Sequence, residues 1–568
     1  MRSTNWLAAP FALVLALTGC ATVPTSGPVE HHTPQAAGVN TGVHVDPLPP
    51  ADGASQQLVV EGFLHAMGVY QPNYGVAREY LTPTASEGWQ PESGVEVYTE
   101  SDQLVESDQG VALSYVQVGS VDSSGIYLSD NTNKRYIFEL AKDSAGQWRI
   151  VNPPTGLMVS RYMFTTNYTA VSLHFLSASG DVLVPDPRFF ASGEQAPAAV
   201  VRAQLDGPSA WLAPVVQKVV TADVGVDGVT VQADGVADVR LAAAAAALPL
   251  EQRTALLSEL AYTMTGLPAV SAVQVSAGGQ PWKSDFGTAQ VAPQTFASRS
   301  PTNTSAPRVL FAISDGKLKR LRDPSRWDDL IEVASGVEKP EQIAVRSDLG
   351  EVAAVTGSGT QLVTAPIGTG KPKVLRVGSA LLRPDYARNG ELWSFAASGP
   401  DSLQVYRDGA AQKVDASALP KGAVVAAKVS QDGARIAVAV RLGNRTEVGL
   451  AVVVRTQGSV RLTGWHAIDL TMNTGTAGRA IDVGWVSATD LAILQVAIGG
   501  QTSVIRVSQD GAAATDIGPS NSGSVEQLAV IPGRTSLALD AGGGVYRFDG
   551  EFTWTLSLTI VEALAYSG

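Results

Sequence analysis

A chain of 568 residues is too long for a single domain, and its 45% hydrophobic and 16% charged residues are typical of a globular protein with several cores. The formal net charge of −13 argues against a nucleic-acid partner, which needs a basic surface, and against electrostatic binding to anionic lipid. Cys20 is the only cysteine, so no disulfide can form within the chain.

The N-terminus has the pattern of a cleaved secretion signal. Arg2 precedes an apolar run from Trp6 to Leu17, about 12 residues long, which is too short to span a bilayer. The run ends in four residues that resemble the lipobox of bacterial lipoproteins: Leu17, Thr18, Gly19 and Cys20.

The lipobox resemblance implies a lipid anchor on Cys20. Its sulfur would carry a diacylglycerol, residues 1–19 would be removed, and the new amine would be acylated with a fatty acid such as palmitate. Losing Arg2 takes the formal charge from −13 to −14. Several acyl chains anchor a protein stably, so we expect it on the extracytoplasmic face of the cell membrane. The alternative is a secreted protein with one unrelated cysteine.

Residues 20–52 are predicted to be a flexible tether. The stretch is rich in Pro, Thr, Gly and Ala and shows no hydrophobic periodicity, so it cannot bury enough apolar surface to order itself. Its average reach is about 30 Å, and its full extension is roughly 100 Å. His31, His32 and His44 lie here, where no fixed geometry supports a metal site.

Residues 53–160 are predicted to form an α+β domain. Val59, Phe63, Met67 and Tyr70 recur at helical spacing, and alternating strands follow, ending at Gln147–Val151. This order resembles the NTF2-like cone, a fold that often holds a pocket. No acid and base pair is placed to use one.

Residues 168–283 are predicted to form a second α+β domain. Its first strand alternates so that His174 falls on the polar face, and a late helix begins at Pro249. The domain resembles the GerMN family, on the motifs Leu183–Arg188, Gln204–Pro208, Asp234–Leu241 and Leu260–Val270. The resemblance implies an interaction module without catalytic residues.

Residues 284–307 are predicted to be a linker, and residues 308–568 an all-β propeller of about six blades. A short apolar strand followed by a polar turn recurs every 35 to 55 residues or so, at Gln342–Gly350, Leu381–Asp385, Ala427–Gly433, Val483–Ser487, Gln527–Gly533 and Glu562–Gly568. Val309–Ile313 opens the domain partway through a blade, so we expect the last repeat to complete that blade and close the ring.

The sequence holds little reactive chemistry, and we predict no enzyme activity, no cofactor and no metal. His65, His174 and His466 fall in different domains, and no nucleophile motif is present. One enzymatic route stays open: Asp328 and Asp329, or acids facing the propeller channel, could form a glycosidase pair. Trp393, Trp465 and Trp485 could stack on sugars, so a propeller that binds or cleaves cell-wall glycan is the alternative.

The whole order resembles the LpqB family of actinobacterial lipoproteins, because a GerMN domain and a propeller follow a lipobox. The resemblance implies a membrane-anchored accessory protein that contacts the external domain of a sensor histidine kinase. That kinase belongs to the MtrAB two-component system, which is tied to cell-wall homeostasis and division. The predicted fold class is therefore multidomain: NTF2-like and GerMN-like α+β domains followed by an all-β propeller.

Overall fold

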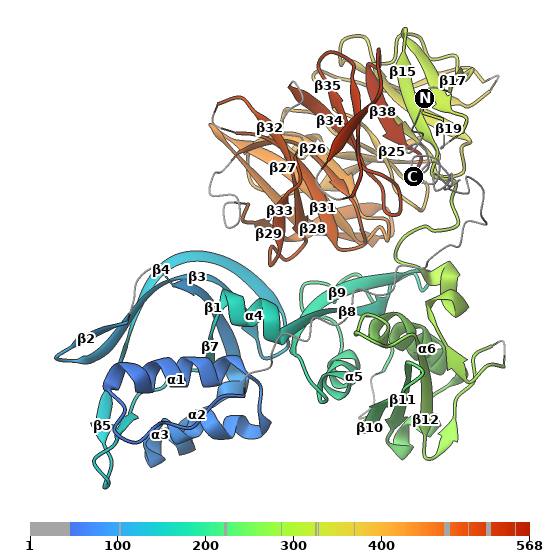
Figure 1. Cartoon of the computed structure of the whole chain (residues 1–568). Helices are drawn as coiled ribbons and strands as arrows, with labels where there is room; N and C mark the ends of the chain where they lie inside the picture. Colours follow the sequence, from blue (N-terminus) through green and yellow to red (C-terminus); the bar gives the residue numbers. More distant parts are fainter. Residues whose placement is uncertain are drawn as a thin grey trace, which may run out of the picture. The chain divides into compact units, whose positions relative to one another are not determined.

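The computed structural model describes residues 46–568, apart from 101–103, 221–223, 286, 324, 325, 328, 369, 471–477, 498, 519–523, 551 and 552. The predicted signal peptide, the lipobox and most of the tether 20–52 lie outside the described residues. In chain order, the described part holds an N-terminal α+β region, a second α+β region and a long region of strands (Figure 1).

The N-terminal region packs helices against a strongly curved sheet (Figure 1). The order of the strands is β2-β3-β1-β7, with β4 on the other side of β3. Its helices are α1 (Gln56–Gly68), η1 (Pro72–Tyr74), α2 (Gly75–Glu79), α3 (Pro83–Gly88), η2 (Pro91–Ser93) and α4 (Arg161–Asn167). Its strands are β1 (Gly94–Glu100), β2 (Val105–Ser107), β3 (Gly110–Asp122), β4 (Tyr127–Phe138), β5 (Leu140–Lys142), β6 (Trp148–Ile150) and β7 (Leu157–Ser160).

Helix α1 follows the predicted period but ends earlier than expected. The Ser55 hydroxyl caps it by accepting from the Leu58 amide at 3.2 Å, and Val59, Phe63 and Met67 are buried. The helix ends at Gly68. The absence of a side chain at Gly68 leaves room for Met163, because a Cβ there would lie 2.8 Å from a side-chain atom of Met163. Tyr70 therefore lies beyond the helix and is 37% exposed.

The second region combines a β-hairpin with a mixed sheet of order β10-β11-β12-β13. Its helices are α5 (Ala196–Asp206), η3 (Ala243–Ala247) and α6 (Leu250–Met264). Its strands are β8 (Tyr168–Leu176), β9 (Leu183–Ala191), β10 (Val226–Val231), β11 (Val236–Leu241), β12 (Ala272–Ala277) and β13 (Gln280–Pro281). Helix α6 connects the parallel strands β11 and β12.

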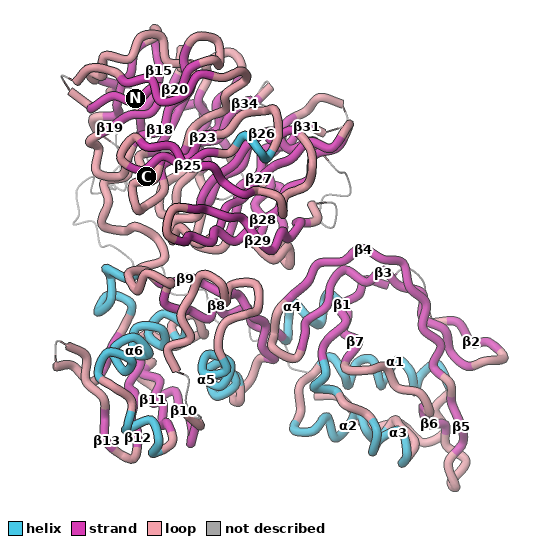
Figure 2. Tube along the Cα trace, turned by 180° about the vertical axis from the view of Figure 1, so that it is seen from behind, coloured by secondary structure: helices cyan, strands magenta, loops and turns pink. Residues whose placement is uncertain are grey.

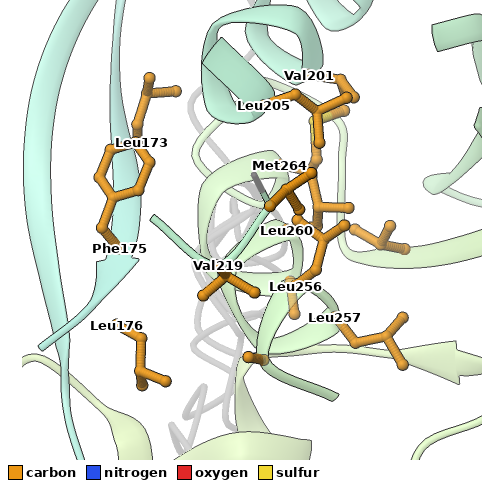
Figure 3. Close-up of a cluster of buried hydrophobic side chains, with 14 of the residues drawn as sticks. Leu173, Phe175, Leu176, Val201, Leu205, Val219, Leu256, Leu257, Leu260 and Met264 are labelled. Atoms are coloured by element: carbon orange, nitrogen blue, oxygen red, sulfur yellow. The ribbon is translucent and has the colours of Figure 1, made fainter. Parts of the chain in front are cut away.

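The core of the second region lies between the hairpin and the two main helices. Leu173 and Phe175 come from β8, Val201 and Leu205 from α5, and Leu260 from α6; all five side chains are buried and meet in one cluster (Figure 3). At about 25 cal/mol per Å² of apolar surface, such a cluster is a main source of stability for this region.

Part of the predicted linker 284–307 is folded. Strand β14 (Gln290–Val291) pairs with β12, and η4 (Pro293–Arg299) follows it. Val291 and Phe296 are buried in the core of the second region. The prediction missed this extension because one two-residue strand and one short 3₁₀ helix carry no hydrophobic period that sequence alone could reveal.

The described residues from Leu310 to Tyr566 form a six-bladed propeller, which confirms the predicted architecture. Blade 1 contains β15 (Leu310–Ser314), β16 (Lys317–Leu321), β17 (Leu330–Glu332) and β38 (Ala563–Tyr566). Blade 2 contains β18 (Gln342–Val345), β19 (Glu351–Thr356), β20 (Gln361–Pro366) and β21 (Lys373–Val377). Blade 3 contains β22 (Asp385–Tyr386), β23 (Leu392–Ser394), β24 (Gln404–Arg407) and β25 (Ala410–Asp415), with η5 (Pro400–Ser402) between β23 and β24. Blade 4 contains β26 (Ala423–Val429), β27 (Arg435–Leu442), β28 (Arg445–Thr456) and β29 (Ser459–Ile468); blade 5 contains β30 (Arg479–Trp485), β31 (Asp490–Val496), β32 (Thr502–Ser508) and β33 (Ala514–Asp516); blade 6 contains β34 (Val525–Ala529), β35 (Leu537–Asp540), β36 (Val545–Phe548) and β37 (Trp554–Leu558). Figure 2 shows how strongly strands dominate this region.

The ring closes as the repeats predicted. Strand β38 pairs antiparallel with β15, so the last strand completes the first blade. The innermost strands β18, β22, β26, β30, β34 and β38 each contact the next around the centre. Gly484 on β30 permits this close approach, because a Cβ there would lie 2.0 Å from a Val530 methyl group. Blades 3 and 4 are also joined at their outer edges, because β25 pairs in parallel with β29.

Candidate functional site

The predicted lipidation site lies outside the described residues. Leu17, Thr18, Gly19 and Cys20 precede Asp46, the first described residue, so the lipid anchor stays a prediction. Across the described part of the chain, no helix is both long enough and apolar enough to cross a membrane.

The propeller channel is the main hollow that the six innermost strands create. One cavity of about 30 Å³ lies along the middle of the channel, lined by residues such as Val345, Tyr386 and Val530. A second hollow of about 190 Å³, which we call the mouth, lies where these strands begin.

An ion pair between blades crosses the channel at the floor of the mouth. Arg383 of blade 3 donates to Asp482 of blade 5 at 2.6 Å and to the Leu528 carbonyl of blade 6 at 2.6 Å. The second carboxylate oxygen of Asp482 accepts from the Leu528 amide at 2.7 Å. Asp482 is 5% exposed, and its hydrogen bonds tie three blades together.

A second ion pair lies deeper in the channel. Lys428 of blade 4 pairs with Asp385 of blade 3, which is 1% exposed. Asp385 also accepts from the Val429 amide at 2.9 Å, and the Trp485 indole donates to the Lys428 carbonyl at 3.1 Å. Buried carboxylates need such partners, because an unpaired charge in this setting would be strongly destabilising.

These ion pairs bear on the alternative that was left open, a glycosidase pair of carboxylates. Asp385 and Asp482 are inward-facing acids from different blades, but cations and backbone amides hold both as structural groups. Asp328 lies outside the described residues, and Asp329 sits in a partly exposed turn with Arg322 at 3.7 Å. Among the described acids, Asp385 and Asp482 are each held by a cation and a backbone amide, so neither is placed as the free carboxyl group of a glycosidase pair.

The tryptophans are mostly structural. Trp393 is fully buried and Trp485 is 2% exposed, so neither presents a face for a sugar. Trp465 is half-buried and donates from its indole nitrogen to Glu447 at 3.0 Å.

The mouth has an acidic rim. Glu341, Glu526 and Glu562 begin the inner strands of three neighbouring blades and are all exposed. One oxygen of Glu341 accepts from the Ser358 amide at 2.5 Å, and one oxygen of Glu562 accepts from the Gly316 amide at 2.9 Å. Within the described part of the chain, the second oxygen of each of these two carboxylates has no hydrogen-bond donor. The rim was not singled out from sequence, although a Glu recurs at the start of three of the repeats.

The histidines do not meet. His65 is exposed on α1, and burial lowers the pKa of the half-buried His466. His174 was expected on the polar face of its strand, but its side chain is only 8% exposed and its ring lies 5.5 Å from that of Tyr262 on α6. Burial lowers the pKa of His174 to about 4. Among the described residues, no three His, Cys, Asp or Glu side chains are grouped so as to hold a metal ion.

Sequence reasoning missed a buried polar network in the second region. Glu259 on α6 is 2% exposed and accepts from the Leu176 amide at 3.0 Å and the Gln204 amide group at 3.4 Å. The Gln204 oxygen in turn accepts from the Thr263 hydroxyl at 2.8 Å. Burial raises the pKa of Glu259 to about 8. Its spacing of three residues from Leu256 and four from Thr263 was the available signal.

Comparisons with known proteins give a consistent result. Family models match residues 49–165 (Lipoprotein LpqB, N-terminal domain), 172–283 (Sporulation and spore germination) and 303–563 (Lipoprotein LpqB beta-propeller domain). Three curated relatives share the name Lipoprotein LpqB. The Cutibacterium acnes protein is 30% identical and covers 98% of both chains; the Thermobifida fusca protein is 27% identical and covers 93% of both; the Streptomyces avermitilis protein is 26% identical and covers 97% of this chain and 96% of its own.

These matches confirm the family resemblance that was inferred from the order of the predicted domains. They cover the two α+β regions and the propeller described above, in the same order along the chain. The chain belongs to the Lipoprotein LpqB family.

Proposed function

We propose that this protein is a lipid-anchored extracytoplasmic accessory protein that acts by contact with a membrane-bound sensor histidine kinase. The kinase would be of the MtrAB type, and the output would be control of cell-wall homeostasis and division. Membership of a lipoprotein family supports the anchor, and the lipobox assigns it to Cys20. The kinase partner follows from the family resemblance of the sequence.

The observation that supports a binding role over a catalytic one is that the acidic side chains in the propeller channel are already engaged in ion pairs. Its two inward-facing aspartates, Asp385 and Asp482, are held by Lys428 and Arg383 and by backbone amides. Ion pairs of this kind make the centre of the propeller rigid. Residues that bind partners usually lie on loops that such a rigid scaffold holds in place.

The tether strengthens the proposal by physical means. The predicted tether, residues 20–52, would keep the folded domains within tens of ångströms of the bilayer, which raises the effective concentration that a membrane partner encounters. Weak contacts then suffice. Binding would change signalling only by favouring one kinase conformation over another.

The test compares kinase output in cells that produce the wild type, Cys20→Ser or Ser26→Ala. The control Ser26→Ala changes the same stretch of chain but leaves the lipobox thiol in place. We expect Cys20→Ser to lose acylation, to leave the membrane fraction in a high-salt wash and to reduce response-regulator phosphorylation. Retention of Cys20→Ser, or equal signalling from all three forms, would contradict the proposal.

The glycan-cleaving alternative has its own test. Purified protein and the double variant Asp328→Asn, Asp329→Asn are incubated with cell-wall glycan. We expect no cleavage from either form. Cleavage by the wild type that the double substitution abolishes would replace the contact role with an enzymatic one.

A further inference from the structure

We propose that the mouth of the propeller channel is a docking site for a basic side chain, an arginine or a lysine, presented by the protein partner. The inference rests on the proposed function, because it names the chemistry of the contact. It concerns the hollow of about 190 Å³ at the start of the innermost strands.

The charge of the mouth is the first part of the argument. Glu341, Glu526 and Glu562 line it together with Asp482, whereas Arg383 is the only cation among its lining residues. Arg383 is already engaged with Asp482 and with the Leu528 carbonyl. The three rim carboxylates are therefore left without a lining cation of their own.

The walls of the mouth select a particular kind of cation. Leu382, Val425 and Leu539 line it along with small alanines, so the hollow joins an apolar wall to an acidic rim. A hydrated metal ion gains nothing from apolar walls. Arginine and lysine match both parts, because their methylene stems pack on apolar surface while their charged heads stay in a wet, acidic setting.

An unsatisfied acceptor on the wall supports the same occupant. The side-chain oxygen of Gln342 is buried and has no donor within the described part of the chain. Buried acceptors are normally satisfied in folded proteins. A guanidinium or ammonium group entering the mouth would bring the donor that Gln342 lacks.

The mouth lies at the end of the channel opposite the segment that precedes the propeller. Residues that precede the propeller are engaged by the loops at the opposite ends of the innermost strands: Arg388, which follows β22, donates to the carbonyls of Ser300 at 2.6 Å and Ser298 at 3.0 Å. The overall negative charge of the chain would also steer a basic partner toward it.

The binding experiment uses the full mature chain with Cys20→Ser and three probes. These are acetyl-Gly-Arg-Gly-amide, the same peptide with citrulline, which keeps the shape without the charge, and the same peptide with glutamate. Three proteins are compared at low salt: the parent, the mouth variant (Glu341→Gln, Glu526→Gln, Glu562→Gln) and an outer variant (Glu332→Gln, Asp401→Asn, Asp516→Asn). The outer variant removes the same charge at exposed positions away from the mouth.

We expect the arginine peptide to bind the parent and the outer variant in the same way, with chemical shifts changing at mouth residues. The mouth variant should bind it roughly tenfold more weakly, and the citrulline and glutamate peptides should not bind. Equal binding by the parent and the mouth variant, equal binding of the citrulline peptide, or no binding of the arginine peptide to the parent would overturn the inference. Circular dichroism and thermal midpoints check that all three proteins are folded.

A second arm separates this inference from the proposed function. The mouth and outer substitutions are placed in the anchored protein, and kinase output is measured beside Cys20→Ser. We expect the mouth variant to reduce kinase output while it remains in the membrane fraction, and the outer variant to leave kinase output unchanged. If both triple variants signal normally and Cys20→Ser does not, the mouth inference is wrong and the proposed function stands. If Cys20→Ser also signals normally, the proposed function fails.

Discussion

Two buried glutamates, one in the propeller and one in the second α+β region, show how differently these regions treat a carboxyl group. Glu391 is 1% exposed and Glu259 is 2% exposed, so both lie out of water. Arg455 and Arg407 form ion pairs with Glu391, with Arg455 at 2.8 Å. Within the described part of the chain, the groups that donate hydrogen bonds to Glu259 are neutral. Equal burial therefore does not imply an equal protonation state.

The pKa values follow from those partners. Burial acts to raise the pKa of Glu391, but hydrogen bonds and charge from Arg455 and Arg407 outweigh it, and the pKa is lowered. For Glu259, burial dominates and the pKa rises to about 8. The propeller is thus held by ionised pairs that cross between blades, while the second region contains a neutral acid at moderate pH.

Removing the closing strand β38 is the change from which we expect the largest difference in stability between the propeller and the second α+β region. Deleting residues 561–568 removes β38, exposes the edge of β15 and leaves the inner ring open. We expect the propeller to lose protease resistance and solubility, while the second region, which does not use that strand, stays protected. Limited proteolysis with mass spectrometry reads out both regions at once. An unchanged melting temperature would show that the ring does not need its last strand.

Glu391→Gln tests the ionised side of the comparison. The substitution leaves Arg455 and Arg407 facing a neutral group, and we expect the propeller to lose about 3 kcal/mol of stability at pH 7. Because the folded pKa is lowered, the stabilisation by Glu391 exists above its ordinary pKa and is lost as the pH falls through the folded value. Chemical unfolding of the wild type and the variant should converge in acid. A difference that persists unchanged at pH 3 would contradict this account.

Glu259→Gln tests the neutral side, and the sign of the pH effect is reversed. A raised folded pKa gives stability that is fully present below the ordinary pKa near 4.5 and is lost as the pH rises through about 8. The wild-type second region should lose on the order of 2 kcal/mol between pH 6 and pH 9, and the variant should not.

Hydrogen exchange of α6 and β8 measures this change locally. The matched control is Glu251→Gln, an exposed position at the start of the same helix, which should keep the wild-type pH dependence. A wild type whose α6 is equally protected at pH 6 and pH 9 would show that Glu259 is not the protonated group we infer.

Much of the fold could be predicted because it is written in local patterns. The innermost strands of all six blades were recognised from repeats of apolar strand and polar turn, and helix α1 from the spacing of Val59, Phe63 and Met67. Short or unpatterned pieces escaped, such as β14 and η4 in the predicted linker, because two residues or one turn carry no period.

The sequence by itself determined the family, the domain order and the closed ring, since each depends on periodicity or on motifs of adjacent residues. It also carries the prediction of a lipid on Cys20. Only the tertiary structure decided which polar groups are buried and which residues form hydrogen bonds or ion pairs with them. Arg383 pairs with Asp482 across 99 residues and Glu391 pairs with Arg455 across 64. Glu259 on α6 is buried where it meets the Leu176 amide of β8, and His174 of β8 is buried beside Tyr262 of α6. The physical reason is that burial and ion pairing depend on which distant segments meet in space, and no spacing along one chain encodes that meeting.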